Sequence, residues 1–270
     1  MKFLTITMVA FVMFAACNSH SYAQSSSRSA PRRVAPPATN VTQPRVDRST
    51  TNRPGFALFE LFTSEGCSSC PPADANLARL NELARQNERI ITLSYHVDYW
   101  NRLGWKDPYS NVAFTKRQRK YAEIFESSSV YTPQMVINGA AEFNGSNQKT
   151  SDRAAKIALG QEPTAEIQIR STANRDSVGV TWETRGLRDD DSIQIALVQN
   201  NALQNVTRGE NANRDLRHVN VVRNLKSAQD RQGKLTLSVP GEFNVGKFHV
   251  VAFIQSASGE IRNATRANIR

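Results

Sequence analysis

The folded part of this 270-residue chain begins with residues 56–86, FALFELFTSEGCSSCPPADANLARLNELARQ. The first eight residues form a nearly continuous apolar run, which predicts a strand buried on both faces of a sheet. Gly66 breaks that run, and Ala73, Leu77 and Leu80 then recur at helical spacing. The local order is therefore predicted to be strand, sharp turn and helix, with a pair of cysteines at the turn.

The segments that follow also alternate between predicted strands and predicted helices. Residues 89–95 (RIITLSY) predict a second strand, and a strand–helix–strand unit implies parallel pairing with a right-handed crossover. A helix is expected over 111–126, a third strand over 130–138 and a short closing helix over 150–159. Together these elements predict an α/β domain over 55–162.

Beyond Pro163 the spacing at which apolar residues recur changes from about 3.6 residues, which is typical of helices, to two residues, which is typical of strands. Alternating runs such as 193–197 and 235–239 are separated by glycine-rich or aspartate-rich breaks. About seven short strands at this spacing are typical of a β-sandwich. We therefore expect residues 163–270 to form a separate all-β, sandwich-like domain.

The N-terminus has the features of an export signal. Lys2 precedes the apolar run 3–16, which is too short to span a bilayer permanently. Cleavage after Ala23 would define a signal peptide of residues 1–23. Cleavage after residue 16 would instead leave Cys17 as a lipidated N-terminus and membrane anchor. Both alternatives place the protein outside the cytoplasm, either in the periplasm or anchored on the outer side of a membrane.

Residues 24–54 are expected to be a disordered linker rich in proline, serine and arginine. Most of the excess positive charge lies at this end of the chain. Of the net charge of +10, residues 24–53 carry five and Lys2 carries one, which leaves +4 for residues 54–270. No basic stripe interleaved with aromatic residues occurs there, so we expect no nucleic-acid partner.

Two of the three cysteines, Cys67 and Cys70, form a CxxC pair where the first strand meets the first helix. The helix dipole and free backbone N–H groups at such a position favour a thiolate. Cys67 is predicted to be the exposed nucleophile. Cys70, one turn further in, would resolve the resulting mixed disulfide.

Three other uses of the pair compete with this one. A structural staple gains little, because closing a four-residue loop contributes only about 2 kcal/mol. A zinc site lacks a second CxxC and the usual short histidine spacing. Binding of Cu(I) by the two thiolates together with Met135 or His96 is the strongest alternative, an exported copper carrier.

Thr132-Pro133 is a second indication of chemistry. Proline inside a predicted strand removes a ladder donor and is tolerated only at an edge, a strand start or a special site. A cis peptide bond at Thr132–Pro133 would explain its position, and we expect this bond to lie beside the Cys67 sulfur.

Strand, CxxC, helix and the later YTP at 131–133 together resemble the thioredoxin superfamily. The strings LFTSEGCSSCPPAD, YHVDYWNRLGWKDPY, VYTPQMVING and GENANRDLRHVNVVR are similar to a bacterial secreted family known as domain-of-unknown-function family 1223, over about residues 55–270. The resemblance implies a thioredoxin-like α/β domain with Cys67 and Cys70 as its redox pair. It also implies that Pro133 and Thr132 face the substrate, and that Glu60 transfers protons as the buried acid.

Aromatic and histidine residues follow the second predicted strand, where α/β sheets commonly bind their ligands. His96 is predicted to tune the thiols or relay protons, and Trp100 or Trp105 to form an apolar groove for a substrate. His218 lies in the β-rich half and is interpreted as a packing or domain-contact residue.

These observations predict an exported thiol–disulfide oxidoreductase that uses Cys67 and Cys70. Its substrate is expected to be a protein or small-molecule disulfide or dithiol. No cofactor and no resident metal are expected.

Overall fold

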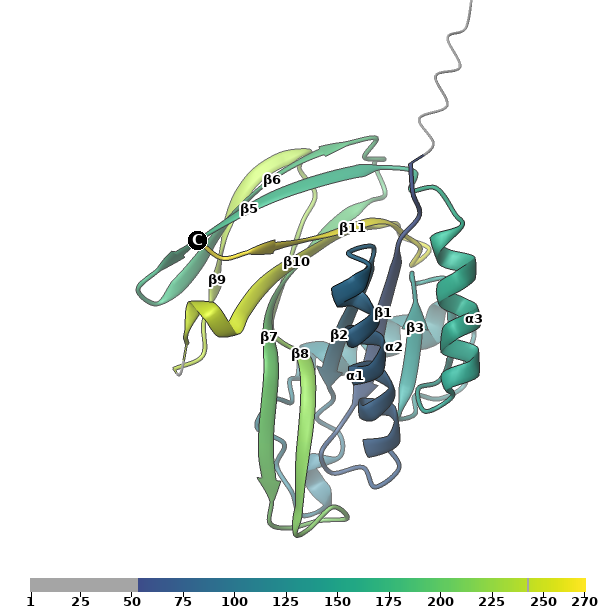
Figure 1. Ribbon diagram of the computed structural model, residues 1–270, viewed down its shortest axis with the longest axis vertical. Helices are drawn as coiled ribbons and strands as arrows, with labels where there is room; N and C mark the ends of the chain where they lie inside the picture. Colours follow the sequence, from purple (N-terminus) through teal and green to yellow (C-terminus); the bar gives the residue numbers. More distant parts are fainter. Residues whose placement is uncertain (1–52, 242) are drawn as a thin grey trace, which may run out of the picture. The chain divides into compact units, whose positions relative to one another are not determined.

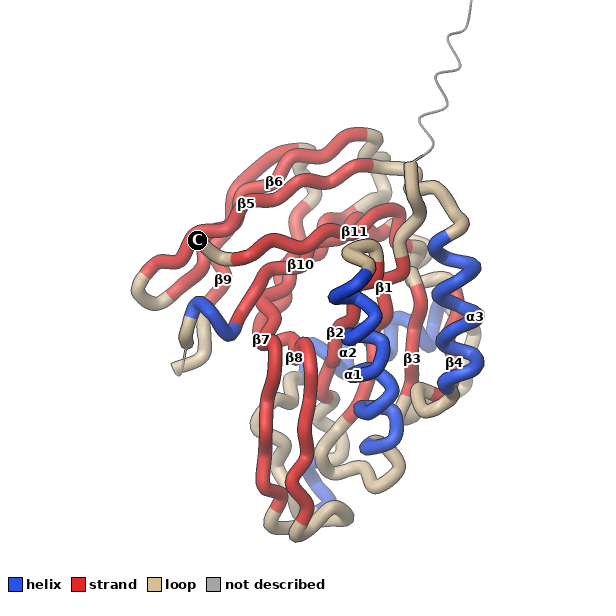
Figure 2. The backbone as a smooth tube through the Cα atoms, in the orientation of Figure 1, coloured by secondary structure: helices blue, strands red, loops and turns tan. Residues whose placement is uncertain are grey.

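The computed structural model describes residues 53–241 and 243–270. The predicted signal segment (1–23 or 1–16), the anchoring Cys17 and nearly all of the predicted linker lie outside these residues. Figure 1 shows the described part coloured along the chain, and Figure 2 shows that strands predominate over helices.

The described residues form eleven strands, three α-helices and two short 3-10 helices. Their order is β1 (Ala57–Thr63), α1 (Pro71–Gln86), β2 (Ile90–His96), η1 (Asn101–Leu103), α2 (Val112–Ile124), β3 (Gln134–Ile137), β4 (Ala141–Asn144), α3 (Gln148–Leu159), β5 (Glu166–Asn174), β6 (Ser177–Arg185), β7 (Ser192–Val206), β8 (Arg214–Ala228), β9 (Gln232–Ser238), η2 (Val245–Lys247), β10 (Phe248–Gln255) and β11 (Ile261–Asn268).

β1 lies inside an eight-stranded mixed sheet with the order β11-β10-β7-β8-β2-β1-β3-β4. It pairs parallel with β2 and antiparallel with β3, and all seven of its residues are buried, as the apolar run predicts. Side chains alternate between the two faces of a strand. Phe59 and Leu61 therefore pack in the core under α1 and α3, whereas Leu58 and Phe62 pack with α2 residues on the opposite face.

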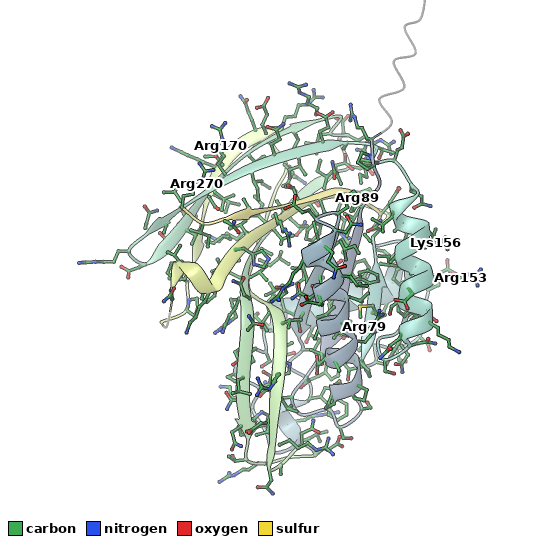
Figure 3. All side chains as sticks on the ribbon, viewed as in Figure 1. Arg79, Arg89, Arg153, Lys156, Arg170 and Arg270 are labelled. Atoms are coloured by element: carbon green, nitrogen blue, oxygen red, sulfur yellow. A yellow bond between two sulfur atoms is a disulfide. The ribbon has the colours of Figure 1, made fainter. Side chains whose placement is uncertain are left out.

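Helix α1 begins where the sequence predicts and buries the expected stripe of Ala73, Leu77, Leu80 and Ala84. Apolar residues at this spacing face the sheet, and removing them from water stabilises the helix against it. The outward side of the helical layer carries charged residues, among them Arg79 of α1 and Arg153 and Lys156 of α3 (Figure 3).

The predicted fold class, a thioredoxin-like α/β domain followed by a separate all-β sandwich, is wrong. One mixed sheet runs through both halves of the chain, because β8 pairs parallel with β2 at Ser94 and Val221. One apolar core accordingly contains Leu58 and Phe62 together with Val251 of β10. Alternation along a strand reveals which residues share a face, but it does not reveal the neighbouring strand.

A second, three-stranded sheet has the order β5-β6-β9. It packs on the part of the large sheet formed by β7 and β10, where Trp182 and Val180 meet Ile195 and Val250. The other departure from expectation is the length of β7 and β8, fifteen residues each, which form a hairpin extending along α1 (Figure 1). The predicted boundary at 162/163 falls between α3 and β5.

Candidate functional site

The two cysteines occupy the turn between β1 and α1, and they form a disulfide with their Cα atoms 5.4 Å apart. The Cys67 N–H donates to the Ser64 carbonyl, and the Cys70 N–H donates to the Cys67 carbonyl, so the turn is closed by its own backbone. Gly66 allows a close approach, because a Cβ there would come within 3.1 Å of the Trp100 Cβ and push the two segments apart. The sequence thus folds the CxxC segment tightly against the loop that follows β2.

A chain of hydrogen bonds reaches the Cys67 sulfur. The Trp100 indole N–H donates to Thr132 Oγ1 at 2.8 Å, and the Thr132 hydroxyl donates to Cys67 Sγ at 3.3 Å. The Thr132–Pro133 peptide bond is cis, as the sequence predicts. The structure therefore brings together predicted site residues from three distant segments of the sequence, namely Cys67, Trp100 and the Thr132–Pro133 pair.

The prediction that Cys67 is exposed is wrong for this disulfide state. Both cysteines are 0% exposed, while Ser68 and Ser69 between them are exposed. Part of the enclosure comes from the tip of the β7–β8 hairpin, which we define as residues 207–213. Glu210 of this tip accepts a hydrogen bond from the Ser68 N–H at 2.9 Å.

Asn211 also holds the tip in place, through two hydrogen bonds. Its side-chain amide donates to the carbonyl oxygens of Glu65 and Cys67, both at 2.9 Å, and the residue is fully buried. Sequence reasoning missed Glu210 and Asn211 as site residues. The only signal was their place in the quoted motif GENANRDLRHVNVVR, because nothing in a polar loop identifies its distant partner.

The first turn of α1 provides no free backbone N–H for a thiolate, which corrects the sequence argument. Pro71 and Pro72 lack the N–H group, and the N–H groups of Ala73 and Asp74 both donate to the Cys70 carbonyl. At Cys67 the polar contacts to sulfur come from side-chain hydroxyls instead of backbone N–H groups. Ser69 Oγ and Thr132 Oγ1 each lie 3.3 Å from Cys67 Sγ.

Behind the turn lies a buried cluster of histidines and carboxylates. His96 Nδ1 lies 2.7 Å from Asp107 Oδ2, and the other contact of that oxygen is the N–H of Glu65 at 2.9 Å. Burial by itself raises the pKa of Asp107, but His96 and the backbone N–H groups of Glu65 and Tyr109 together outweigh burial and hold that pKa below its usual value. The contact fixes the segment that leads into the CxxC turn.

His218 of β8 completes this cluster and contacts residues of the N-terminal half, which agrees with its interpretation as a packing or domain-contact residue. It lies 3.3 Å from Glu65 and 3.8 Å from Asp74, and its ring is 4.6 Å from that of His96 between centroids. These are ion-pair distances without hydrogen-bond geometry. Burial lowers the pKa of His218, but the two carboxylates outweigh burial and raise it to about 10. His218 is therefore a cation at neutral pH.

Glu60 does not contact the cysteines, although the sequence assigned it proton transfer. Its two carboxylate oxygens accept hydrogen bonds from the Arg117 guanidinium at 2.6 and 2.9 Å, and Tyr121 donates a third. Glu60 lies on the α2 face of β1 because it shares that face with Leu58. The structure thus gives Glu60 a buried ion pair in place of the predicted thiol partner.

No group of three or more histidine, cysteine or acidic side chains is arranged to hold a metal within residues 53–241 and 243–270. Met135, the candidate copper ligand, is buried among the apolar residues under α1. Trp105 donates its indole N–H to Glu65 at 2.8 Å instead of lining an open groove. In the described part of the chain, no helix has the length and apolar character needed to cross a membrane.

Fold and site together define a mixed-sheet protein with a CxxC disulfide enclosed at a strand-to-helix turn. Residues 58–255 match the family described as "Protein of unknown function (DUF1223)", and the chain belongs to that family. No curated protein matches the sequence.

Several solved structures are similar to this chain. A crystal structure of a protein from Agrobacterium tumefaciens is 27% identical, covers 78% of this chain and 92% of that chain, and has a TM-score of 0.58. HBP35 of Porphyromonas gingivalis is 15% identical, covers 80% of this chain and 76% of that chain, and has a TM-score of 0.52. The second likeness concerns the fold alone.

Proposed function

We propose that the protein is an exported thiol–disulfide oxidoreductase in which Cys67 and Cys70 are the redox pair. The observation that carries the proposal is the hydrogen bond from Thr132 Oγ1 to Cys67 Sγ at 3.3 Å. It places a polarised hydroxyl, itself bonded by Trp100, against one sulfur of a disulfide at a helix start. A disulfide that serves only as a staple has no need of a donor at one of its sulfurs.

The proposed reaction begins with both cysteines reduced. The Cys67 thiolate attacks one sulfur of a substrate disulfide, forms a mixed disulfide and releases the first substrate sulfur as a thiolate. The Cys70 thiolate then attacks Cys67 Sγ, which releases the second substrate sulfur. Two electrons pass to the substrate, and the Cys67–Cys70 disulfide forms. The same steps in reverse oxidise a dithiol substrate.

Thr132 and Trp100 would stabilise the charged form of Cys67. Hydrogen bonds to ionised groups are roughly twice as strong as neutral ones. The Trp100 indole donates to the Thr132 oxygen and leaves the threonine proton directed at sulfur. Thr132 contacts the Cys67 sulfur and immediately precedes Pro133. A substrate bound beside the Thr132–Pro133 peptide bond would therefore lie next to Cys67.

His96 has a positioning role in this proposal. It pairs with Asp107, and Asp107 accepts the N–H of Glu65, two residues before Cys67. His218 acts at the same place by pairing with Glu65 and Asp74. These contacts fix the backbone on both sides of the CxxC turn, which thiol attack requires because the three reacting sulfurs must align.

Access to the pair requires movement of the hairpin tip. Ser68 and Cys67 are held by Glu210 and Asn211, while the tip itself is exposed at Glu210. We propose that the substrate displaces residues 207–213 as it binds.

The experiment that tests the function is a thiol count combined with a redox equilibrium. The purified protein is expected to show no titratable thiol until it is reduced and two thiols afterwards, and to follow a single two-electron transition in glutathione buffers. A control with Cys67→Ala should show one thiol and no transition. Retention of stoichiometric copper by the reduced protein, without exchange in glutathione, would support the copper carrier and contradict the oxidoreductase.

A further inference from the structure

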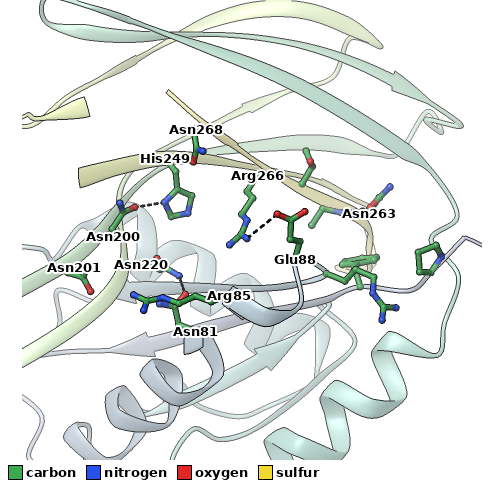
Figure 4. Close-up of a pocket in the computed structure, with 15 residues that line it drawn as sticks. Asn81, Arg85, Glu88, Asn200, Asn201, Asn220, His249, Asn263, Arg266 and Asn268 are labelled. Carbon is green, nitrogen blue, oxygen red and sulfur yellow. Dashed lines mark hydrogen bonds and ion pairs between the residues drawn. The ribbon is translucent and has the colours of Figure 1, made fainter. Parts of the chain in front are cut away.

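A cavity of about 610 Å³ lies at the end of α1 that is remote from the cysteines (Figure 4). Arg85 in the last turn of α1 lines it, whereas Cys70 precedes the first turn of the same helix. The remaining walls come from β7, β8, β10 and β11 and from the segments just before β1 and β2. The cavity forms because β8 pairs with β2 only at Ser94 and Val221, so the two strands diverge elsewhere. Its volume is in the range of small-molecule sites.

The lining of this cavity is polar and positively charged. It contains six asparagines and three arginines against a single glutamate, Glu88. Figure 4 shows Arg266 paired with Glu88, an ion pair with an N–O distance of 4.0 Å in which the Arg266 side chain is 38% exposed and the Glu88 side chain 90% exposed. Formal charges therefore sum to +2 in a concave site. The composition excludes an apolar ligand and favours an anion with several hydrogen-bonding groups.

Some of the lining amides hold the walls together. Asn220 Nδ2 donates to Asn81 Oδ1 at 2.8 Å and to Thr92 at 2.7 Å, and Asn200 Oδ1 lies 2.7 Å from His249 Nδ1. Burial, aided by Arg266, lowers the pKa of His249 to about 4, so this imidazole is neutral at physiological pH. These interactions make the walls a preformed arrangement and not a set of loose surface residues.

Other polar groups of the lining remain available to a ligand. The side-chain amides of Asn201 and Asn268 make no hydrogen bond within the part of the chain that the structure describes, and both residues are exposed at the cavity. Each carboxamide presents one acceptor and two donor hydrogens, which matches the hydroxyl groups of a polyol. Arg266 offers a planar fork, the geometry that binds a carboxylate with two parallel hydrogen bonds.

We propose that this cavity binds a carboxylated polyol, the chemistry of a sugar acid. Arg266 receives the carboxylate, and the asparagines of β7 and β11 receive the hydroxyl groups. The inference is independent of the thiols, because it concerns the opposite end of α1.

Calorimetric titration of the full-length protein with D-glucuronate, D-glucose and acetate tests the proposal. We expect saturable binding of glucuronate with a Kd of about 1 mM or tighter, and at least about tenfold weaker binding of glucose and of acetate. If glucose binds as tightly as glucuronate, the cavity does not recognise the carboxylate charge. Acetate binding as well would show an unspecific anion site, and no glucuronate binding up to about 10 mM overturns the proposal outright.

Two variants assign the site. Arg266→Gln should remove the preference for glucuronate over glucose, and Asn201→Ala combined with Asn268→Ala should weaken glucuronate at least about fivefold. Arg153→Gln on α3, outside the cavity (Figure 3), is the matched control for loss of one positive charge. Cys67→Ala should bind glucuronate normally, so failure here and failure of the redox proposal are distinguishable. Unchanged binding in both cavity variants contradicts the assignment.

Discussion

Removing the hydroxyl that faces Cys67 should raise the pKa of the Cys67 thiol. Thr132→Val keeps the shape of the side chain and deletes the donor that lies 3.3 Å from the sulfur. A hydrogen bond to a charged group contributes about 1.5–3 kcal/mol, and a pKa change of one corresponds to about 1.4 kcal/mol. We therefore expect the pKa to rise by about one to two.

The reactivity should change less than the pKa. If the pKa rises by one, the thiolate fraction at a lower pH falls about tenfold, whereas the more basic thiolate gains about threefold in intrinsic nucleophilicity. Alkylation of Cys67 should consequently slow by about threefold to fourfold for each such rise, and the midpoint of its pH profile should move upward. Trp100→Phe, which removes the donor to Thr132, should move the midpoint in the same direction by a smaller amount.

The assay uses a Cys70→Ala background, in which Cys67 is the one thiol left among the residues that the structure describes. Thiolate absorbance followed against pH gives the pKa directly and does not depend on access for a reagent. Thr181→Val, at an exposed strand position of β6, is the matched control and should leave the midpoint unchanged. An identical midpoint in Thr132→Val and the parent would refute the inference that this hydroxyl stabilises the thiolate.

Three other perturbations follow from the buried contacts. Asn211→Ala leaves two buried carbonyl oxygens without their donor and should lower the free energy of unfolding in urea by about 1–3 kcal/mol. Dithiothreitol should also reduce the disulfide faster in this variant. Equal stability and equal reduction rates would show that the hairpin tip does not shield the disulfide. His218 has a folded-state pKa of about 10 against 6.5 unfolded, so its contribution is complete below pH 6.5 and is lost as pH rises towards 10. The free energy of unfolding of the oxidised protein should fall over that window, and His218→Gln should abolish the fall; the same slope in the variant argues against the ion pairs. Arg117→Met leaves the Glu60 carboxylate buried without its partner and should lower the free energy of unfolding by about 3–5 kcal/mol. Adding Glu60→Gln should restore part of that loss. Additive losses in the double variant would contradict a coupled pair.

Local features were predictable because their causes are local. The buried strand over 57–63 and the apolar stripe of α1 follow from side-chain periodicity alone. The cis bond before Pro133 is predicted from a proline inside the strand expected over 130–138, although β3 itself begins one residue later, at Gln134. The CxxC turn at Cys67 follows from the break at Gly66 between these elements.

The features that the sequence did not reveal all depend on long-range pairing. β2 and β8 meet at one register position across more than a hundred residues, and nothing in either strand's alternation identifies the other. The same limit hid the contact of Asn211 with Cys67 and that of His218 with Glu65. Glu60, which the resemblance assigned to the thiols, pairs with Arg117 instead, because alternation along β1 places it on the α2 face with Leu58.

The measurement that tests the redox role most directly is the trapping of a mixed disulfide by purified single-cysteine variants. Reduced Cys70→Ala, incubated with a peptide disulfide, should accumulate a covalent adduct on Cys67 that disappears on reduction, because no internal thiolate remains to release it. Cys67→Ala should trap nothing, and the wild-type protein should release the peptide as free thiols. Adduct formation on Cys70 in Cys67→Ala, or no adduct with either variant, would contradict attack by Cys67.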